Sequence, residues 1–124
     1  MKEYIKFGHK KMIIWQNIDR IDSFVNEMIL PRIHSYKRWL RNQIESALDS
    51  VGANFVEGYY SGSIREYLRF IRYSKRSLAE LRDRIERCVK KKIISDELFE
   101  SFEKLACQTL YLYSRLISAL ERKL

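Results

Sequence analysis

The sequence predicts an all-α protein folded as an antiparallel up-down-up-down four-helix bundle. Apolar residues recur at helical spacing through four long segments, and short turn signals separate the segments. With 124 residues, 46% of them hydrophobic, four Gly and one Pro, the chain can bury one core. We therefore treat residues 1–124 as a single domain. The helices are expected over about residues 10–30, 33–59, 64–91 and 96–122.

The first two helices are predicted from their apolar stripes. In the first, every third or fourth residue from Ile14 to Met28 is apolar. Pro31, the only proline, ends this helix or opens the next one at its first position. The stripe of the second helix runs from Leu40 to Phe55.

The third and fourth helices have clear start signals. Ser63, with Glu66 three residues later, forms a capping box, and Ser95 is a natural N-cap for the last helix. The cations of Lys90–Lys92 complement the macrodipole at the end of the third helix. Short connections make neighbouring helices antiparallel.

One face of the third helix carries a row of cations, which we call the arginine row. It consists of Arg65, Arg69, Arg72, Lys75 and Arg76. Spacings of i, i+4, i+7 and i+11 put its guanidinium groups in one line. Glu66 is the only acid between Arg65 and Arg76, so we expect the row to lack acidic partners. The alternative is that the row is a solvated face of a basic protein.

Two further basic clusters and the overall charge indicate a polyanionic partner. The clusters are Arg32, Lys37, Arg38 and Arg41, and Lys10 with Lys11. The formal net charge is +8, which favours nucleic acid first and an anionic membrane surface second. Arginines near Tyr67, Tyr73 or Trp39 could combine phosphate contact with base stacking, a mode suited to RNA.

Polar residues form a ridge beside the stripe of the second helix. They are Ser50, Asn54 and Glu57, at i, i+4 and i+7. We expect a structural hydrogen-bond network that ties this helix to the third helix or to the chain entering the first. A ligand-binding or catalytic role is the alternative.

Aromatic residues exceed what one core can bury. Residues 110–113 are consecutive and apolar, so they cannot all face inward. We predict that Trp15, Tyr111 and Tyr113 lie in an interface between copies of the chain. The alternative is that these rings cap the ends of the bundle.

The search for catalytic chemistry gives no candidate, and we expect no enzyme, metal or cofactor. His9 and His34 lack the Glu-x-x-His spacing of a di-iron bundle. Cys88 and Cys107 are expected to be a core thiol and a surface thiol and not a disulfide, which indicates a reducing, cytoplasmic setting. No apolar run approaches the length of a membrane span.

A motif across the second and third helices resembles a known family. It comprises Gln43-Ile44, Ala47, Ser50-Val51, Asn54, Glu57-Gly58-Tyr59, Tyr67-Leu68-Arg69-Phe70 and Ser77-Leu78-Ala79-Glu80-Leu81, with Trp15-Gln16 upstream. The family is the four-helix bundle proteins first noticed as open reading frames in intervening sequences of large-subunit ribosomal RNA genes. The resemblance covers about residues 12–120. Phe55, Val56 and Arg76 depart from the pattern.

The resemblance implies a head-to-tail homopentameric ring around a central channel. Relatives include the accessory variability proteins of diversity-generating retroelements, which resemble barrels that hold a reverse transcriptase and its template RNA. The hypothesis is thus a non-enzymatic ring that binds nucleic acid, RNA before DNA, with a reverse transcriptase as a partner. The alternative is a homo-oligomeric scaffold or adaptor that binds an acidic protein.

Overall fold

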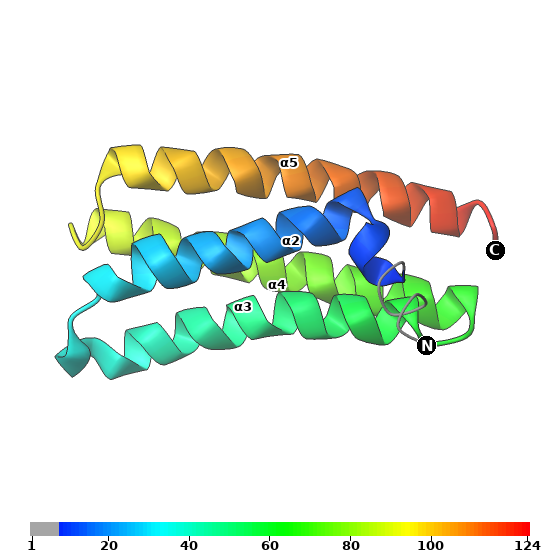
Figure 1. The fold of residues 1–124 in the computed structure, drawn as a ribbon, viewed down its shortest axis with the longest axis horizontal. Helices are drawn as coiled ribbons and strands as arrows, with labels where there is room; N and C mark the ends of the chain where they lie inside the picture. Colours follow the sequence, from blue (N-terminus) through cyan, green and yellow to red (C-terminus); the bar gives the residue numbers. More distant parts are fainter. Residues whose placement is uncertain (1–7) are drawn as a thin grey trace.

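The computed structural model describes residues 8–124, and these form an all-helical bundle without strands. Four long helices make up the fold, and in Figure 1 α2 and α4 run from right to left while α3 and α5 run from left to right. The prediction of an all-α fold is confirmed. The helices are α2 (Ile13–Phe24), α3 (Arg38–Tyr59), α4 (Ile64–Lys90) and α5 (Asp96–Glu121).

The connection between α2 and α3 is longer than the sequence predicts. A π-helical turn, η2 (Val25–Ile29), and a 3-10 turn, η3 (Leu30–Arg32), follow α2, and α3 begins only after η4 (Ser35–Lys37). Pro31 explains the break, because its ring has no N–H to donate and clashes with a carbonyl of the preceding turn. The Arg32 guanidinium donates to the Met28 carbonyl at 2.6 Å, which satisfies one carbonyl of that irregular turn.

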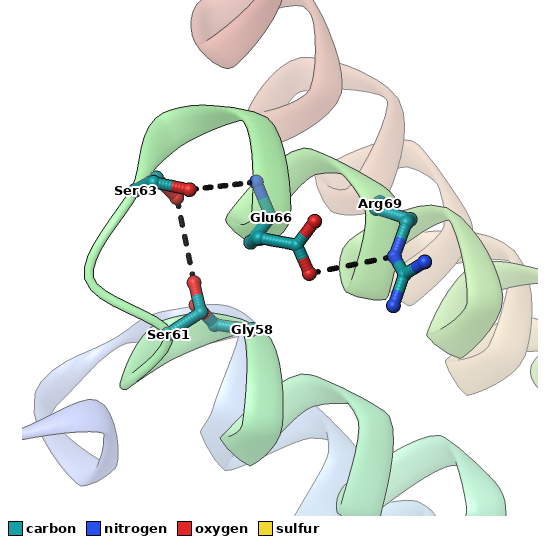
Figure 2. A network of polar contacts seen from close by, with 5 residues as sticks. All are labelled: Gly58, Ser61, Ser63, Glu66 and Arg69. Carbon is teal, nitrogen blue, oxygen red and sulfur yellow. Dashed lines mark hydrogen bonds and ion pairs between the residues drawn. The ribbon is translucent and has the colours of Figure 1, made fainter.

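The α3–α4 turn is held by serine side chains (Figure 2). The Ser61 hydroxyl donates to the Gly58 carbonyl at 2.7 Å, and Gly62 takes a φ of +86°, which favours glycine. Ser63 caps α4 by accepting from the Glu66 N–H at 3.1 Å. The Glu66 carboxylate turns to Arg69 instead of back to the cap, so the predicted capping box forms only by half.

The C-terminal end of α4 forms a Schellman motif. The Ile93 N–H donates to the Cys88 carbonyl at 2.8 Å and the Lys92 N–H to the Val89 carbonyl at 2.9 Å. Lys92 has a φ of 61°, in the left-handed region where glycine is usual. The chain then enters α5, where Ser95 accepts from the Leu98 N–H at 3.1 Å, as predicted.

The core runs the whole length of the bundle, and its largest buried side chains come from all four helices. Tyr113 is 0% exposed, which makes its predicted place in an interface between copies wrong. Its hydroxyl hydrogen-bonds to the hydroxyl of Ser74, which also donates to the Val51 carbonyl at 2.6 Å. This buried network lets one polar tyrosine sit in the centre of an apolar core.

The two cysteines are a core thiol and a surface thiol, as the sequence predicts. Cys88 on α4 is buried and Cys107 on α5 is exposed, and both are free. Within residues 8–124 no helix is both long and apolar enough to cross a membrane.

Two glycines of α3 give opposite predictions. A Cβ on Gly58 would lie 2.9 Å from the Phe70 Cβ and 3.1 Å from the Tyr67 carbonyl oxygen, because α3 and α4 approach closely there. We expect Gly58→Ala to lower the free energy of unfolding by about 1–3 kcal/mol through overpacking.

Gly52→Ala is the matched control for this substitution. Its Cβ would meet only the Trp15 ring at 3.7 Å, an ordinary contact, so the variant should gain up to about 1 kcal/mol from helix propensity. Urea unfolding followed by circular dichroism measures both. Equal stability of the two variants would contradict the close approach at Gly58.

Candidate nucleic-acid interface

The arginine row lies where α4 faces α5. Arg72, Lys75 and Arg76 of the row line a shallow groove of about 600 Å³ between these helices. Its apolar lining comes from Ala79 on α4 and from Leu110 and Ile117 on α5; Ser114 and Glu121 complete it. The groove therefore has a cationic side on α4 and a mainly apolar side on α5 that also carries Glu121, an arrangement that can hold a phosphate and a base together. We call it the α4–α5 groove.

The prediction that the row lacks acidic partners is wrong for two of its members. Arg69 pairs with Glu66 at 3.5 Å, and Arg72 pairs with Glu121 of α5 at 2.7 Å. The sequence could not place Glu121 beside α4, because that contact depends on how the helices pack. All four of these side chains are about half exposed, so each pair is worth only about 0–1 kcal/mol and can yield to a phosphate.

The remaining cations of the row have no ion pair within residues 8–124. Arg65 and Arg76 are exposed, and the Lys75 ammonium donates to the Ser114 hydroxyl at 3.2 Å. The row thus carries five positive groups against two carboxylates and keeps a net positive charge.

Aromatic rings lie among the guanidinium groups of the row. The Arg69 guanidinium lies 5.1 Å from the centroid of the Phe70 ring and 5.7 Å from that of Tyr73. Arg76 lies on the same Tyr73 ring, also at 5.7 Å. Tyr73 is itself exposed, so it offers a π-face between two cations. Tyr67, by contrast, is half-buried, and burial raises its pKa to about 12.

The second basic cluster gains a member that the sequence analysis missed. Lys91, at the end of α4, lies 5.4 Å from the ring of Trp39, which is 54% exposed at the start of α3. Lys37 stacks on Tyr36 at 5.9 Å. The α2–α3 connection and the α4–α5 turn both lie at the left end of the bundle in Figure 1. The Lys90–Lys92 run is the sequence signal for this cation, and its place at a helix end predicts only a contact with the helix dipole.

The three basic clusters do not form one surface. Arg38 and Arg41 line a small groove of about 230 Å³ at the start of α3. Arg76 and Lys91 are separated by about 22 Å along the α4 axis. Lys10 and Lys11 lie in the short turn η1 (His9–Lys11), next to the opposite end of the bundle, where the His9 imidazole contacts the Tyr60 hydroxyl at 3.0 Å.

The polar ridge of α3 does not tie helices together. The Asn54 amide donates to the Ser50 carbonyl of its own helix at 2.9 Å, while Glu57 is exposed. The predicted network is therefore a local contact. The buried network that does link α3, α4 and α5 uses Ser74 and Tyr113, because those positions face the core and the ridge does not.

The other two predicted interface aromatics have different environments. Tyr111 is 61% exposed on α5, and the Arg115 guanidinium lies 5.9 Å from its ring centroid. Trp15 is half-buried on α2, with its ring 5.7 Å from that of Phe55, and it also lines a surface groove.

The titratable groups of residues 8–124 show no activated nucleophile. Burial raises the pKa of the Cys88 thiol, and desolvation raises that of Cys107. The Glu103 carboxylate has a lowered pKa because it accepts hydrogen bonds from Arg82, whose own pKa is raised by the same contact. That pair links α5 to α4 in a structural role. No group of His, Cys, Asp and Glu within residues 8–124 could hold a metal ion.

Comparison with known proteins identifies a family for this chain. A search of curated proteins finds no match for this sequence. The sequence matches the family described as 23S rRNA-intervening sequence protein over residues 10–114, which span α2, α3, α4 and most of α5. The chain therefore belongs to the 23S rRNA-intervening sequence protein family.

Proposed function

We propose that this protein is a non-enzymatic, up-down-up-down bundle that assembles into a cyclic homopentamer and binds RNA through the arginine row and the α4–α5 groove. One observation carries the proposal. Three cations, Arg72, Lys75 and Arg76, converge on a groove whose opposite wall on α5 is mainly apolar, with Ser114 and the half-exposed Glu121 beside Leu110 and Ile117. Phosphate oxygens would meet the cations and an unstacked base would meet the apolar wall.

Single-stranded or structured RNA fits this site better than duplex DNA. Sequence-tolerant binding of single strands combines a positive groove with exposed π-faces. Tyr73, exposed between Arg69 and Arg76, provides such a face. The ribosomal RNA named in the description of the family points in the same direction.

Assembly into a ring would strengthen RNA binding. Each copy would present one α4–α5 groove, so a strand that engages several copies binds with avidity. The proposal also includes a reverse transcriptase as a protein partner, because the sequence resembles the family to which the accessory variability proteins are related.

Salt dependence tests the proposal. We expect the affinity for a labelled single-stranded RNA to fall by about 300-fold or more between 50 and 200 mM salt, as binding through six or more phosphates of a single strand requires. Fluorescence anisotropy measures this, with DNA of the same sequence as the comparison. Absence of RNA binding at 50 mM salt would overturn the proposal and favour the scaffold that binds an acidic protein.

A further inference from the structure

The α2–α3 face is acidic although the chain is strongly basic. No Lys or Arg occurs between Arg41 and Arg65. Asp19 and Asp22 of α2 and Asp49 of α3 line one groove on this face. None of the three carboxylates has an ion pair within residues 8–124.

The groove between α2 and α3 combines these carboxylates with an apolar wall. It has a volume of about 500 Å³, and we call it the α2–α3 groove. Trp15 lies across Gly52, and the small residues Gly52 and Ala53 leave the groove open. The pKa of Asp22 is raised by burial and by its negative neighbours Asp19 and Asp49. A groove of this kind fits an amphipathic cation, whose charge would relieve the repulsion.

A complementary surface lies on the outer side of α5. We call it the α5 ridge, and it consists of four exposed residues: Tyr111, Arg115, Ser118 and Arg122. The spacing of i, i+4, i+7 and i+11 puts these residues in one line. Arg115 donates to the Tyr111 hydroxyl at 3.3 Å, so cation and ring form one unit.

The cations of the α5 ridge lack counter-ions. No acid occurs from Leu105 to Leu120, and Glu121 already pairs with Arg72. Arg115 and Arg122 have no ion pair within residues 8–124, in contrast to the partly neutralised arginine row. Arg115 and Arg122 also line a shallow surface depression with small side chains, which lets another backbone approach.

We propose that the α2–α3 groove receives the α5 ridge of a second copy of this chain. The contact would be heterologous, because it joins the groove of one copy to the ridge of the next. Such a head-to-tail contact can repeat from copy to copy and close into a ring. It rests on the self-association in the proposed function and names the surfaces that produce it. Trp15 in the groove and Tyr111 on the ridge would be the central aromatic anchors, with the charges around them.

This contact leaves the RNA site free. The α4–α5 groove uses residues of α5 that neighbour the ridge residues but point in another direction, since successive residues on a helix turn by about 100°. Each copy in the ring would then keep its arginine row exposed.

Two charge-reversal variants test the contact. In the groove variant Asp19→Lys is combined with Asp49→Lys, and in the ridge variant Arg115→Glu is combined with Arg122→Glu. Each variant alone should be monomeric, because like charges then meet. An equimolar mixture should form hetero-oligomers in which the two variants alternate, since a native ridge meets a native groove and a reversed ridge meets a reversed groove. Strict alternation cannot close a ring of five, so the expected result is recovery of association and not of the parent's pentamer. Sedimentation velocity measures all three samples.

The control has the same change in net charge as the groove variant, at residues outside the groove. Glu80→Lys with Glu100→Lys alters exposed acids that have no ion pair within residues 8–124, and it should assemble like the parent. Circular dichroism melts verify that every variant is folded.

The outcomes separate this proposal from the proposed function. If the groove and ridge variants assembled like the parent, the proposed groove–ridge contact would be wrong, and the proposed ring would form through other surfaces. A parent that is monomeric throughout the micromolar range would overturn both. If reversal of Arg65, Arg69 and Arg72 abolished assembly as the groove variant does, the arginine row and not the ridge would occupy the groove. RNA binding is measured separately, and the monomeric ridge variant should still bind RNA, with reduced avidity.

Discussion

Reversal of Arg65, Arg69 and Arg72 to Glu is expected to abolish RNA binding. A hydrogen bond to a charged group contributes about 1.5–3 kcal/mol, so loss of three such contacts weakens affinity by at least about a thousandfold at low salt. The new carboxylates would also repel phosphates, and Glu121 would lose its partner Arg72. Fluorescence anisotropy against labelled RNA measures the loss.

Salt titration of the same variant identifies the cause. For single strands the slope of log affinity against log salt changes by about 0.7 for each phosphate contact, so three lost contacts should flatten any residual slope by about 2. The matched control reverses Arg87, Lys104 and Lys123, three exposed cations away from the α4–α5 groove. RNA binding by the triple variant at the parent's affinity would show that the arginine row is only a solvated face.

Tyr113→Ala is expected to destabilise the bundle by about 3–5 kcal/mol. Removal of a fully buried aromatic ring leaves a cavity in the core, and the Ser74 hydroxyl loses its partner. Tyr113→Phe keeps the ring and removes only the hydroxyl, so it should cost about 1–2 kcal/mol. Urea unfolding followed by circular dichroism measures both variants, at several protein concentrations because assembly adds to apparent stability.

Tyr111→Ala is the control for this substitution. Tyr111 is 61% exposed, so its removal should change the unfolding free energy of the monomer by less than about 0.5 kcal/mol. It should instead weaken assembly through the α5 ridge. If Tyr113→Ala were as stable as Tyr111→Ala, the buried Ser74–Tyr113 network would not support the core.

The candidate site was predictable only in part. The positions of the row follow from helical spacing, since Arg65 to Arg76 must share a face wherever the helix lies. The acidic partners of the row do not follow from the spacing, because Glu121 of α5 contacts Arg72 of α4 only through the packing of the two helices. Lys91 joins Trp39 for the same reason. The α2–α3 groove is not visible in the sequence, because its aspartates come from two helices, α2 and α3, that only the fold brings together.

What the sequence determined by itself is local. Periodicity gave four helices, and side chains within three residues gave the caps at Ser63 and Ser95. Tertiary packing decided which of two neighbouring tyrosines is buried: Tyr113 faces Ser74 while Tyr111 faces outward. Two aromatic residues at i and i+2 are on different faces of a helix, and a wide apolar arc does not reveal which face meets the neighbouring helices.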